Sequence, residues 1–366
     1  MTGMELAKTE RRPTDVDWPT LLAPYRQPAT WRSLFQLFNT AIPFAAVWLI
    51  MLWSLQVSYW LTLVLAVPAA LLTARLFMFQ HDCGHGSFFR SRRLNNLVGS
   101  IIGVVTLVPY AYWRKTHAIH HAGSGNLDQR GFGDVDTLTV REYLALPRAK
   151  RLRYRLYRNP FVLFVVGPIW QFVLKHRFPH DLPRAWRREW ESIHRNNLAL
   201  LGVLAFMGLT IGFKNFALVQ APITVMTGSL GVFLFYVQHQ YEDTYWRHRD
   251  AWNYFEAGLE GSSHLVLPKT LQWFTANIGL HHVHHLSSQI PNYQLQRCLD
   301  ENPELQGVTR LTIRESFRTL GMTLWDEDER QLVGFGDLPR IRERIARRGE
   351  DAGTPEALRS LPPGWR

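Results

Sequence analysis

The apolar residues of this chain lie in long blocks that are separated by strongly polar segments. Residues 41–57 ("AIPFAAVWLIMLWSLQV") and 60–79 carry one charge between them, Arg75, and a second pair of blocks covers residues 198–213 and 222–237. Each block approaches the roughly 20 residues that an α-helix needs to cross a ~30 Å hydrocarbon layer. Because a short connection joins each pair, the pattern predicts two helical hairpins in a membrane rather than buried helices of a soluble protein.

The positive charges lie outside these predicted hairpins. The chain has 366 residues and a formal net charge of +11, yet the connections inside the hairpins hold only Lys214. Basic clusters occur instead at residues 90–93, 148–158 and 184–195. By the positive-inside rule these flanking segments are expected on the cytoplasmic side, where they contact anionic lipid headgroups. We do not expect nucleic acid as a partner, because the sequence has no zinc-finger spacing, RNP string or basic zipper.

These patterns predict an all-α, multi-pass integral membrane protein with four transmembrane helices in two hairpins and a cytoplasmic helical cap. Residues 1–33 are expected to form a cytoplasmic N-terminal segment, 34–320 the membrane domain and 321–366 a cytoplasmic tail. Within the tail, "PRIRERIARRGEDAGTPE" is expected to be solvated and partly disordered. Two shorter apolar stretches, 97–113 and 160–178, are broken by Gly or Pro and are expected to be interfacial or re-entrant.

Three short motifs place histidines three or four positions apart, and such residues share one face of a helix. The motifs are "HDCGH", "HAIHH" and "HHVHH". Because all three follow predicted spans on one side of the membrane, they can meet in one site, and eight imidazoles exceed the three or four ligands of a zinc site. The sequence therefore predicts two metal ions bound by His81, His85, His117, His120, His121, His281, His284 and His285.

The residue types alone do not choose the metal, because imidazole suits iron, copper, nickel and zinc. The H-E-x-x-H string of zinc peptidases is absent from the sequence. Soluble di-iron bundles use two E-x-x-H motifs, and this chain has one, at Glu191 and His194. The remaining possibility is a metal site whose ligands are nearly all neutral nitrogen donors.

The order of the motifs between two hairpins resembles the integral-membrane fatty acid desaturases, which carry three histidine boxes. The segments "HDCGHGSFF", "HAIHHAGSGNLD", "VQHQYEDTYW" and "NIGLHHVHHLSSQIPNYQLQ" are most similar to bacterial acyl-lipid desaturases of the omega-6 or delta-12 type. The resemblance covers about residues 30–320. It implies two non-haem iron ions, dioxygen as oxidant, an acyl chain of a membrane lipid as substrate, and the eight histidines above as ligands.

The resemblance also implies a ninth ligand and a separate electron donor. We choose His239 in "VQHQYED" as the ninth ligand, because it lies where the fourth predicted span meets the cytoplasm. Family members take electrons from ferredoxin or cytochrome b5. No H-P-G-G haem motif occurs in this sequence, so the donor is expected to be another protein.

Several residues near the motifs are weaker candidates. Asn277 lies four positions before His281 and could hold a metal-bound water, His264 is interpreted as structural, and His282 stays open because a shifted register would include it. Carboxylates that could orient imidazole N–H groups are Asp82, Asp134, Asp136, Glu242 and Asp243. Aromatic residues that could line the mouth of a substrate tunnel are Trp113, Tyr241, Tyr245 and Trp246. Histidines interpreted as surface or interface residues are His176, His180, His194 and His248.

The chemistry expected of such a site is oxidation of an unactivated hydrocarbon. A methylene group has no accessible pKa, so acid–base catalysis cannot remove its hydrogens and an oxidising metal centre is required. We therefore expect an acyl-chain desaturase. A carotenoid ketolase or hydroxylase, or an alkane hydroxylase, would use the same histidine shell. A membrane metal transporter is the non-enzymatic alternative, but it would carry ligands near mid-bilayer, and the predicted spans are almost free of them.

Overall fold

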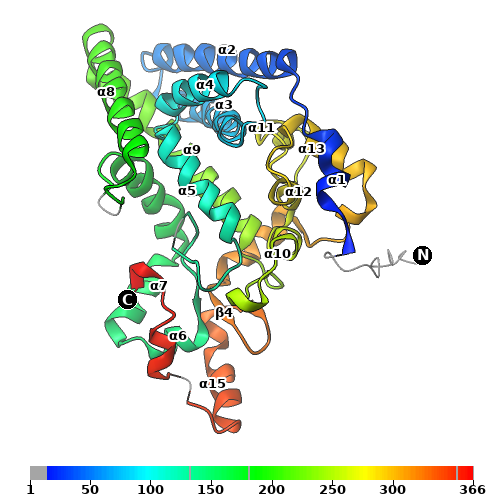
Figure 1. Ribbon diagram of the computed structural model, residues 1–366. Helices are drawn as coiled ribbons and strands as arrows, with labels where there is room; N and C mark the ends of the chain where they lie inside the picture. The colour runs from blue at the N-terminus through cyan, green and yellow to red at the C-terminus, as the bar shows by residue number, and fades with distance from the viewer. Residues whose placement is uncertain (1–14, 132, 180–181, 352, 366) are drawn as a thin grey trace, which may run out of the picture.

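The computed structural model describes residues 15–131, 133–179, 182–351 and 353–365, and most of these residues are helical (Figure 1). The longest helices come in two consecutive pairs, α2 with α3 and α8 with α9. The α-helices are α1 (Trp18–Leu22), α2 (Thr30–Ser54), α3 (Tyr59–His85), α4 (Arg92–Val105), α5 (Tyr110–Gly123), α6 (Val140–Ala145), α7 (Arg148–Tyr157), α8 (Arg187–Thr210), α9 (Phe213–His239), α10 (Tyr254–Glu260), α11 (Lys269–Phe274), α12 (His281–Leu286), α13 (Asn292–Glu301), α14 (Ile313–Arg318) and α15 (Leu338–Arg347).

The two predicted hairpins correspond to these helix pairs, although α2 and α8 begin before the predicted spans and end three residues before those spans end. Within the described residues, α2, α3 and α9 are long and apolar enough to cross a membrane, and a bent pair, α4 with α5, would bring the number to four. Helix α8 contains most of the predicted third span, but its first half is polar and Gly212, with φ +83°, separates it from α9. Its apolar part is therefore shorter than the roughly 20 residues of a full crossing.

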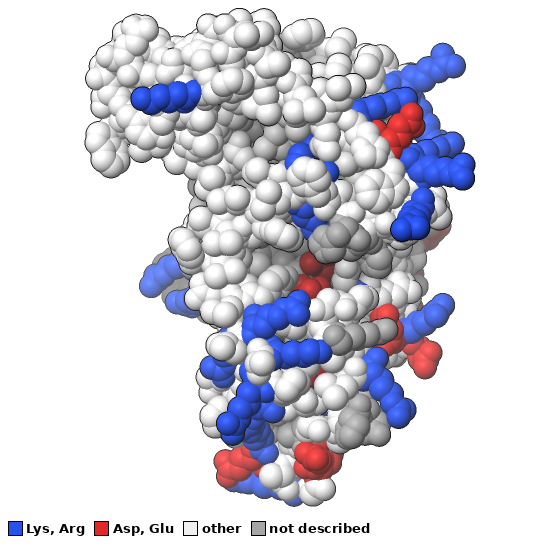
Figure 2. Space-filling view, turned by 90° about the vertical axis from the view of Figure 1, so that its left-hand side faces the viewer, with Lys and Arg blue, Asp and Glu red and all other residues white. Residues whose placement is uncertain are grey.

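The two shorter apolar stretches form bent or irregular helices. Helices α4 and α5 meet at an angle of 102°, and Leu107 in their connection has φ +61°. The stretch expected at 160–178 contains two π-helical segments, Val162–Val166 and Ile169–Lys175. Trp170 and Phe178 of this stretch are exposed. Figure 2 shows one face of the molecule, on which the upper left part is almost free of charged side chains, while Lys and Arg lie along the right-hand edge and over the lower part.

The polar part of the molecule, which we call the cap, contains α6, α7, α10 to α15 and two small sheets. Strand β1 (Leu138–Thr139) pairs parallel with β4 (Leu324–Asp326), which pairs antiparallel with β5 (Gln331–Val333). Strand β2 (His264–Val266) pairs parallel with β3 (Arg310–Thr312). The expectation of an all-α fold missed these sheets, because strands of two or three residues are too short to show an alternating pattern.

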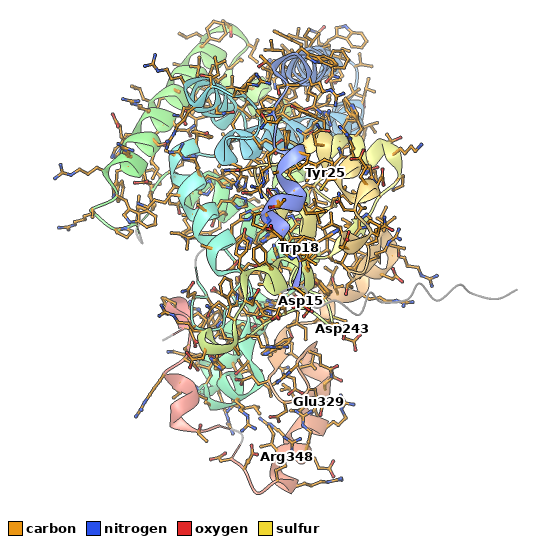
Figure 3. All side chains as sticks on the ribbon, turned by 45° about the vertical axis from the view of Figure 1, so that its right-hand side comes forward. Asp15, Trp18, Tyr25, Asp243, Glu329 and Arg348 are labelled. Carbon is orange, nitrogen blue, oxygen red and sulfur yellow. The ribbon has the colours of Figure 1, made fainter. Side chains whose placement is uncertain are left out.

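The N-terminal segment packs onto the cap where the structure describes it. Trp18 and Leu22 are buried together with apolar residues of α12 and α13, and Figure 3 labels Trp18 and Tyr25 along this segment. The Tyr25 hydroxyl donates to Glu301 Oε2 over 2.7 Å and accepts from Asn302 Nδ2 over 3.0 Å. These contacts hold the start of α2 close to the end of α13.

The prediction that residues 339–356 are partly disordered is wrong for their helical part. Helix α15 is ordered, and Ile341 and Ile345 are each 1% exposed in a cluster with Leu138 and Trp365. Arg344 donates to both carboxylate oxygens of Asp326 over 2.7 Å. The apolar stripe that drives this packing has only three residues. Because arginines surround them in the sequence, the stripe was too weak a pattern to predict a buried helix.

Replacing Ile345 by valine is expected to lower the free energy of unfolding of the cap by about 1 kcal/mol, because it deletes one buried methylene. Arg342→Ala on the exposed side of the same helix is the matched control and should change it by less than about 0.5 kcal/mol. Thermal unfolding of the detergent-solubilised protein measures both. Equal stability of the two variants would show that Ile345 of α15 does not pack into the cluster with Leu138 and Trp365.

Candidate metal centre

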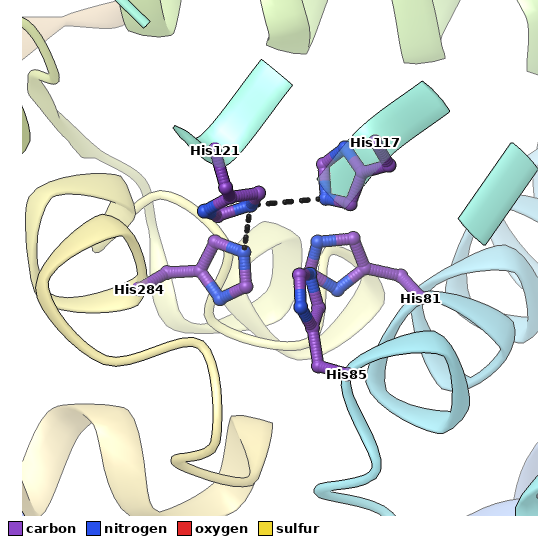
Figure 4. A group of neighbouring side chains, drawn as sticks. All are labelled: His81, His85, His117, His121 and His284. Carbon is purple, nitrogen blue, oxygen red and sulfur yellow. Dashed lines mark hydrogen bonds between the residues drawn. The ribbon is translucent and has the colours of Figure 1, made fainter. Parts of the chain in front are cut away.

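Four helices bring the nine predicted ligands to one place. His81 and His85 lie in the last turn and a half of α3, and His239 is the last residue of α9. The second and third motifs lie on α5 and α12. Figure 4 shows five of the rings pointing toward one another from α3, α5 and α12. The helical spacing expected from the sequence is therefore observed in each motif.

The nine imidazoles form two groups, and in each group every ring has one nitrogen atom that lies within 4.8 Å of the corresponding nitrogens of all the others. The first group is His81, His85, His117, His121 and His284, and the second group is His120, His239, His281 and His285. The groups adjoin, since the ring of His121 stacks on that of His285 with centroids 4.2 Å apart. This arrangement is suited to two neighbouring metal ions.

In each group the Nε2 atoms of different imidazoles point toward one another at hydrogen-bonding distance. The Nε2 atom of His121 lies 3.1 Å from that of His117 and 3.1 Å from that of His284. In the second group the Nε2 atoms of His281 and His239 are 3.0 Å apart. Two imidazoles bound at right angles to one ion, with bonds of about 2.1 Å, would place their nitrogens about 3.0 Å apart. The donor set therefore fits metal ions.

The outward ring nitrogens of three histidines have hydrogen-bond partners in the protein. His120 Nδ1 hydrogen-bonds the carboxylate of Asp134, and His239 Nδ1 donates to the carbonyl of Gly261 over 2.9 Å. His81 Nδ1 makes a longer contact of 3.4 Å with Asp82. Partners of this kind fix the tautomer of a ligand, so that Nε2 presents its lone pair to a metal.

Comparison with known proteins identifies the kind of enzyme that has this arrangement. The family model described as Fatty acid desaturase matches residues 58–316. The chain belongs to the fatty acid desaturase family. A relative named "Fatty acid desaturase" from Bacillus subtilis (strain 168) is 47% identical over 320 residues, which cover 87% of this chain and 90% of the relative. The protein is thus an oxidoreductase that acts on fatty acyl chains.

Two cyanobacterial relatives have more specific names. The chain is 30% identical over 227 residues to "sn-1 oleoyl-lipid 12-desaturase" from Synechocystis sp., a match that covers 60% of this chain and 62% of the relative. It is 29% identical over 233 residues to "sn-1 acyl-lipid omega-3 desaturase (ferredoxin)" from the same organism, with 62% of each chain covered. The apolar helices and the family together make this desaturase a membrane protein.

The histidines of the third motif lie in a buried environment that disfavours their charged form. Burial, and after it the neighbouring imidazoles, hold the pKa of His281, His284 and His285 well below the ordinary value for histidine. Only a neutral imidazole has a lone pair that can bind a metal ion. These side chains therefore do not have to release a proton before a metal ion binds.

Asp82 was a candidate partner of the histidines, and its main contacts are elsewhere. Its Oδ2 atom accepts from the backbone N–H and from the side-chain amide of Asn292, both over 2.9 Å. The Asn292 amide also exchanges hydrogen bonds with Gln36 of α2. The network joins α2, α3 and α13 beside His81. Asn292 and Gln36 escaped the sequence analysis because they lie more than 200 positions apart.

Three other residues that the sequence left open lie outside both groups. His282 is fully buried and faces His264, with ring centroids 5.8 Å apart, and burial lowers the pKa of His264 to about 4. Asn277 was expected one helical turn before His281, which is wrong because α12 begins at His281. Asn277 instead has φ +60°, and its amide donates to the carbonyl of Asn292 over 2.9 Å.

The remaining carboxylate candidates do not contact the histidine groups within the described residues. Asp136 accepts from Trp365 Nε1 over 2.9 Å. Glu242 and Asp243 are exposed, and Figure 3 shows Asp243 at the outside of the molecule. Among the five carboxylates proposed from the sequence, Asp134 makes the close contact with a clustered imidazole, and Asp82 makes a longer one.

Of the histidines interpreted as surface or interface residues, the three that the structure describes also lie outside both groups. His248 contacts Asp128 over 3.0 Å and Glu327 over 3.4 Å, while His176 is buried and hydrogen-bonds Gln171. His194 is exposed and stacks on Trp190. His180 lies outside the described residues.

Aromatic residues surround the histidine groups. Trp113 stacks on His117 with centroids 4.5 Å apart, and the Phe235 ring lies 5.0 Å from that of His120. A small cavity beside His239 is lined by Asp134, Phe235, Tyr245 and Trp246, among others. Tyr241 is buried and hydrogen-bonds the carbonyl of Glu260. These rings keep bulk water away from the imidazoles, and a dry site is suited to oxidising a hydrocarbon.

Proposed function

We propose that the desaturase holds two iron ions, one in each histidine group, and uses dioxygen to introduce a double bond into the acyl chain of a membrane lipid. The observation that carries the proposal is the division of nine buried imidazoles into groups of five and four, with Nε2 atoms facing one another at 3.0 to 3.1 Å. When bound, the irons would supply the oxidising chemistry that no side chain of the protein can provide.

The protein residues have three tasks in this proposal. The nine imidazoles bind and space the metals, and Asp134 and the Gly261 carbonyl hold the outward nitrogens of His120 and His239. Trp113 and Phe235 exclude water from the rings. Because the ligands lie on fixed helices, the position of the acyl chain relative to them decides which carbon reacts.

A lipid-bound acyl chain is the substrate that best fits a protein of this kind. The two cyanobacterial relatives are named as desaturases of acyl lipids, and the length and apolar character of α2, α3 and α9 support a site close to a bilayer. The basic clusters that flank the apolar helices favour the cytoplasmic side for the histidines. The fourth crossing in this proposal is α8 beside α9, and a locally thinned bilayer would match its short apolar part.

The test is to express the gene in a host that lacks the product and to locate double bonds in its lipids by gas chromatography and mass spectrometry. We expect a new unsaturated acyl chain in the glycerolipid fraction and about two irons per purified chain, one for each group. His194→Ala, at an exposed ring outside both groups, should keep both irons. An oxygenated product without an alkene, or a chain that binds no iron, would refute the proposal.

A further inference from the structure

Helix α7 of the cap presents a strongly basic surface with apolar residues at its centre. Its sequence "RAKRLRYRLY" contains five cations and no acidic residue. Arg148, Arg153 and Arg155 are exposed, and between them lie Leu152 and Leu156, which are 59% and 55% exposed. The face seen in Figure 2 has Lys and Arg side chains gathered over its lower part. An apolar centre surrounded by arginine is typical of a surface that binds another protein.

The C-terminal turn Pro363–Trp365 is attached to this helix. Lys150 Nζ donates to the carbonyl of Trp365 over 3.1 Å, and Arg153 donates to the carbonyl of Gly364 over 3.1 Å. The Arg153 guanidinium lies over the Trp365 ring at 4.6 Å, and the ring packs edge-on against Tyr154 with centroids 5.1 Å apart. Trp365 is therefore a buried ring directly beneath a basic surface.

A short bonded route leads from Trp365 to the second histidine group. Trp365 Nε1 donates to Asp136 Oδ2 over 2.9 Å, and Asp134, two residues earlier, hydrogen-bonds His120 Nδ1. The route consists of two hydrogen bonds and the backbone from Asp134 to Asp136, and two consecutive Cα–Cα steps span at most about 7 Å. Electron transfer slows steeply with distance, and bonds carry electronic coupling better than gaps. The geometry is thus suited to electron entry.

The reaction needs such an entry point. Forming a double bond removes two hydrogen atoms from the acyl chain, which supplies two electrons and two protons. Reduction of one dioxygen to two water molecules takes four electrons and four protons. The other two electrons and two protons must come from outside the substrate, and the electrons require a reductant that this chain does not contain.

We propose that α7 and the C-terminal turn form the docking surface for a small acidic one-electron redox protein. Two such molecules in succession would deliver the two electrons through Trp365, Asp136 and Asp134 to the second histidine group. The inference rests on the proposed di-iron function. An acidic partner fits because the five cations of α7 have no acidic neighbour on the helix, and complementary charge speeds encounter with a transient partner.

The test uses full-length, iron-loaded protein in nanodiscs of neutral phosphatidylcholine and an acidic [2Fe–2S] ferredoxin as the probe. In Arg148→Glu/Arg155→Glu, the Kd for ferredoxin at low salt is expected to rise by about 10-fold or more, because two attractive charges become repulsive. Turnover with a small chemical reductant should stay at the wild-type level. Arg340→Glu/Arg342→Glu on α15 makes the same charge change on another helix of the cap and should keep the wild-type Kd.

The outcomes distinguish docking from membrane contact. If both double variants bind ferredoxin equally well, the docking inference is wrong. The unfolding temperature in anionic phosphatidylglycerol nanodiscs is then compared with that in neutral phosphatidylcholine nanodiscs. If anionic lipid stabilises the wild type and the α15 variant but not the α7 variant, α7 contacts lipid instead. Failure of the proposed function would appear separately, as wild-type protein that binds no iron or makes no alkene with the chemical reductant.

Trp365→Phe tests the route, because it removes the indole N–H and keeps an aromatic ring. We expect an unchanged Kd for ferredoxin and a several-fold slower turnover with ferredoxin, while turnover with the chemical reductant stays the same. Equal slowing with both reductants would show that Trp365 has only a structural role, and the route through Asp136 would be abandoned.

Discussion

His284→Ala is expected to reduce desaturation at least ~100-fold and to lower the iron content from about two to about one per chain. His284 is 1% exposed, and its Nε2 atom lies 3.1 Å from that of His121 in the first group. Loss of an outer partner of a ligand costs 10–100-fold, so loss of a ligand itself should cost at least as much. Iron analysis and double-bond location in the host lipids measure the two effects.

His282→Gln is the matched control for this variant, since His282 lies two residues away on the same short helix and is also buried. It faces His264 and belongs to neither group, so the control should keep both irons. If the wild type and His284→Ala produce equal amounts of the new alkene, His284 is not a ligand of the metal site. Equal loss of iron in both variants would mean that any change in α12 disrupts the site.

The histidine positions could be predicted because the signal is local. Spacings of three and four residues fix which rings share a helix face, as with His117 and His121, and that rule does not depend on the rest of the fold. The ninth histidine was expected from the family resemblance, and the end of an apolar block selected His239 for that place. What spacing could not supply was the division into two groups, since His120 and His121 are adjacent in sequence and belong to different groups.

Features that depend on contacts distant in sequence were missed. Strand β1 pairs with β4, about 185 positions later, and neither strand is long enough to show a pattern. The three-residue apolar stripe of α15 is buried because the fold brings Leu138 and Trp365 to it from distant parts of the chain. Asn277 was placed on a helix that begins four residues later. Its left-handed backbone conformation could not be predicted, because asparagine adopts that conformation more often than most residues but is also common elsewhere.

The choice of Asp134 over the other carboxylates also comes from the fold. Gly133, with φ +72°, lets the loop approach α5 so closely that an added Cβ would lie 3.3 Å from the His120 Cβ atom. The next residue, Asp134, then reaches His120 Nδ1. Glu242 follows His239 by three positions and was an equal candidate from the sequence, but α9 ends at His239 and the Glu242 side chain is exposed.

Asp134→Ala is expected to weaken iron binding in the second group by 10- to 100-fold, roughly the effect of removing the hydrogen-bond partner of a metal-bound histidine. Without the carboxylate, His120 loses the contact that keeps its proton on Nδ1 and its Nε2 lone pair toward the metal. Competition with a chelator measures the affinity of each iron. Only one iron per chain should become easier to remove, because Asp134 contacts a member of one group.

Asp134→Asn should have a smaller effect, since its amide oxygen can still accept from Nδ1. Glu242→Ala is the control and should retain both irons as the wild type does. If Asp134→Ala releases both irons together, the two groups do not bind metal independently, and the assignment of His120 to a separate second site must be revised.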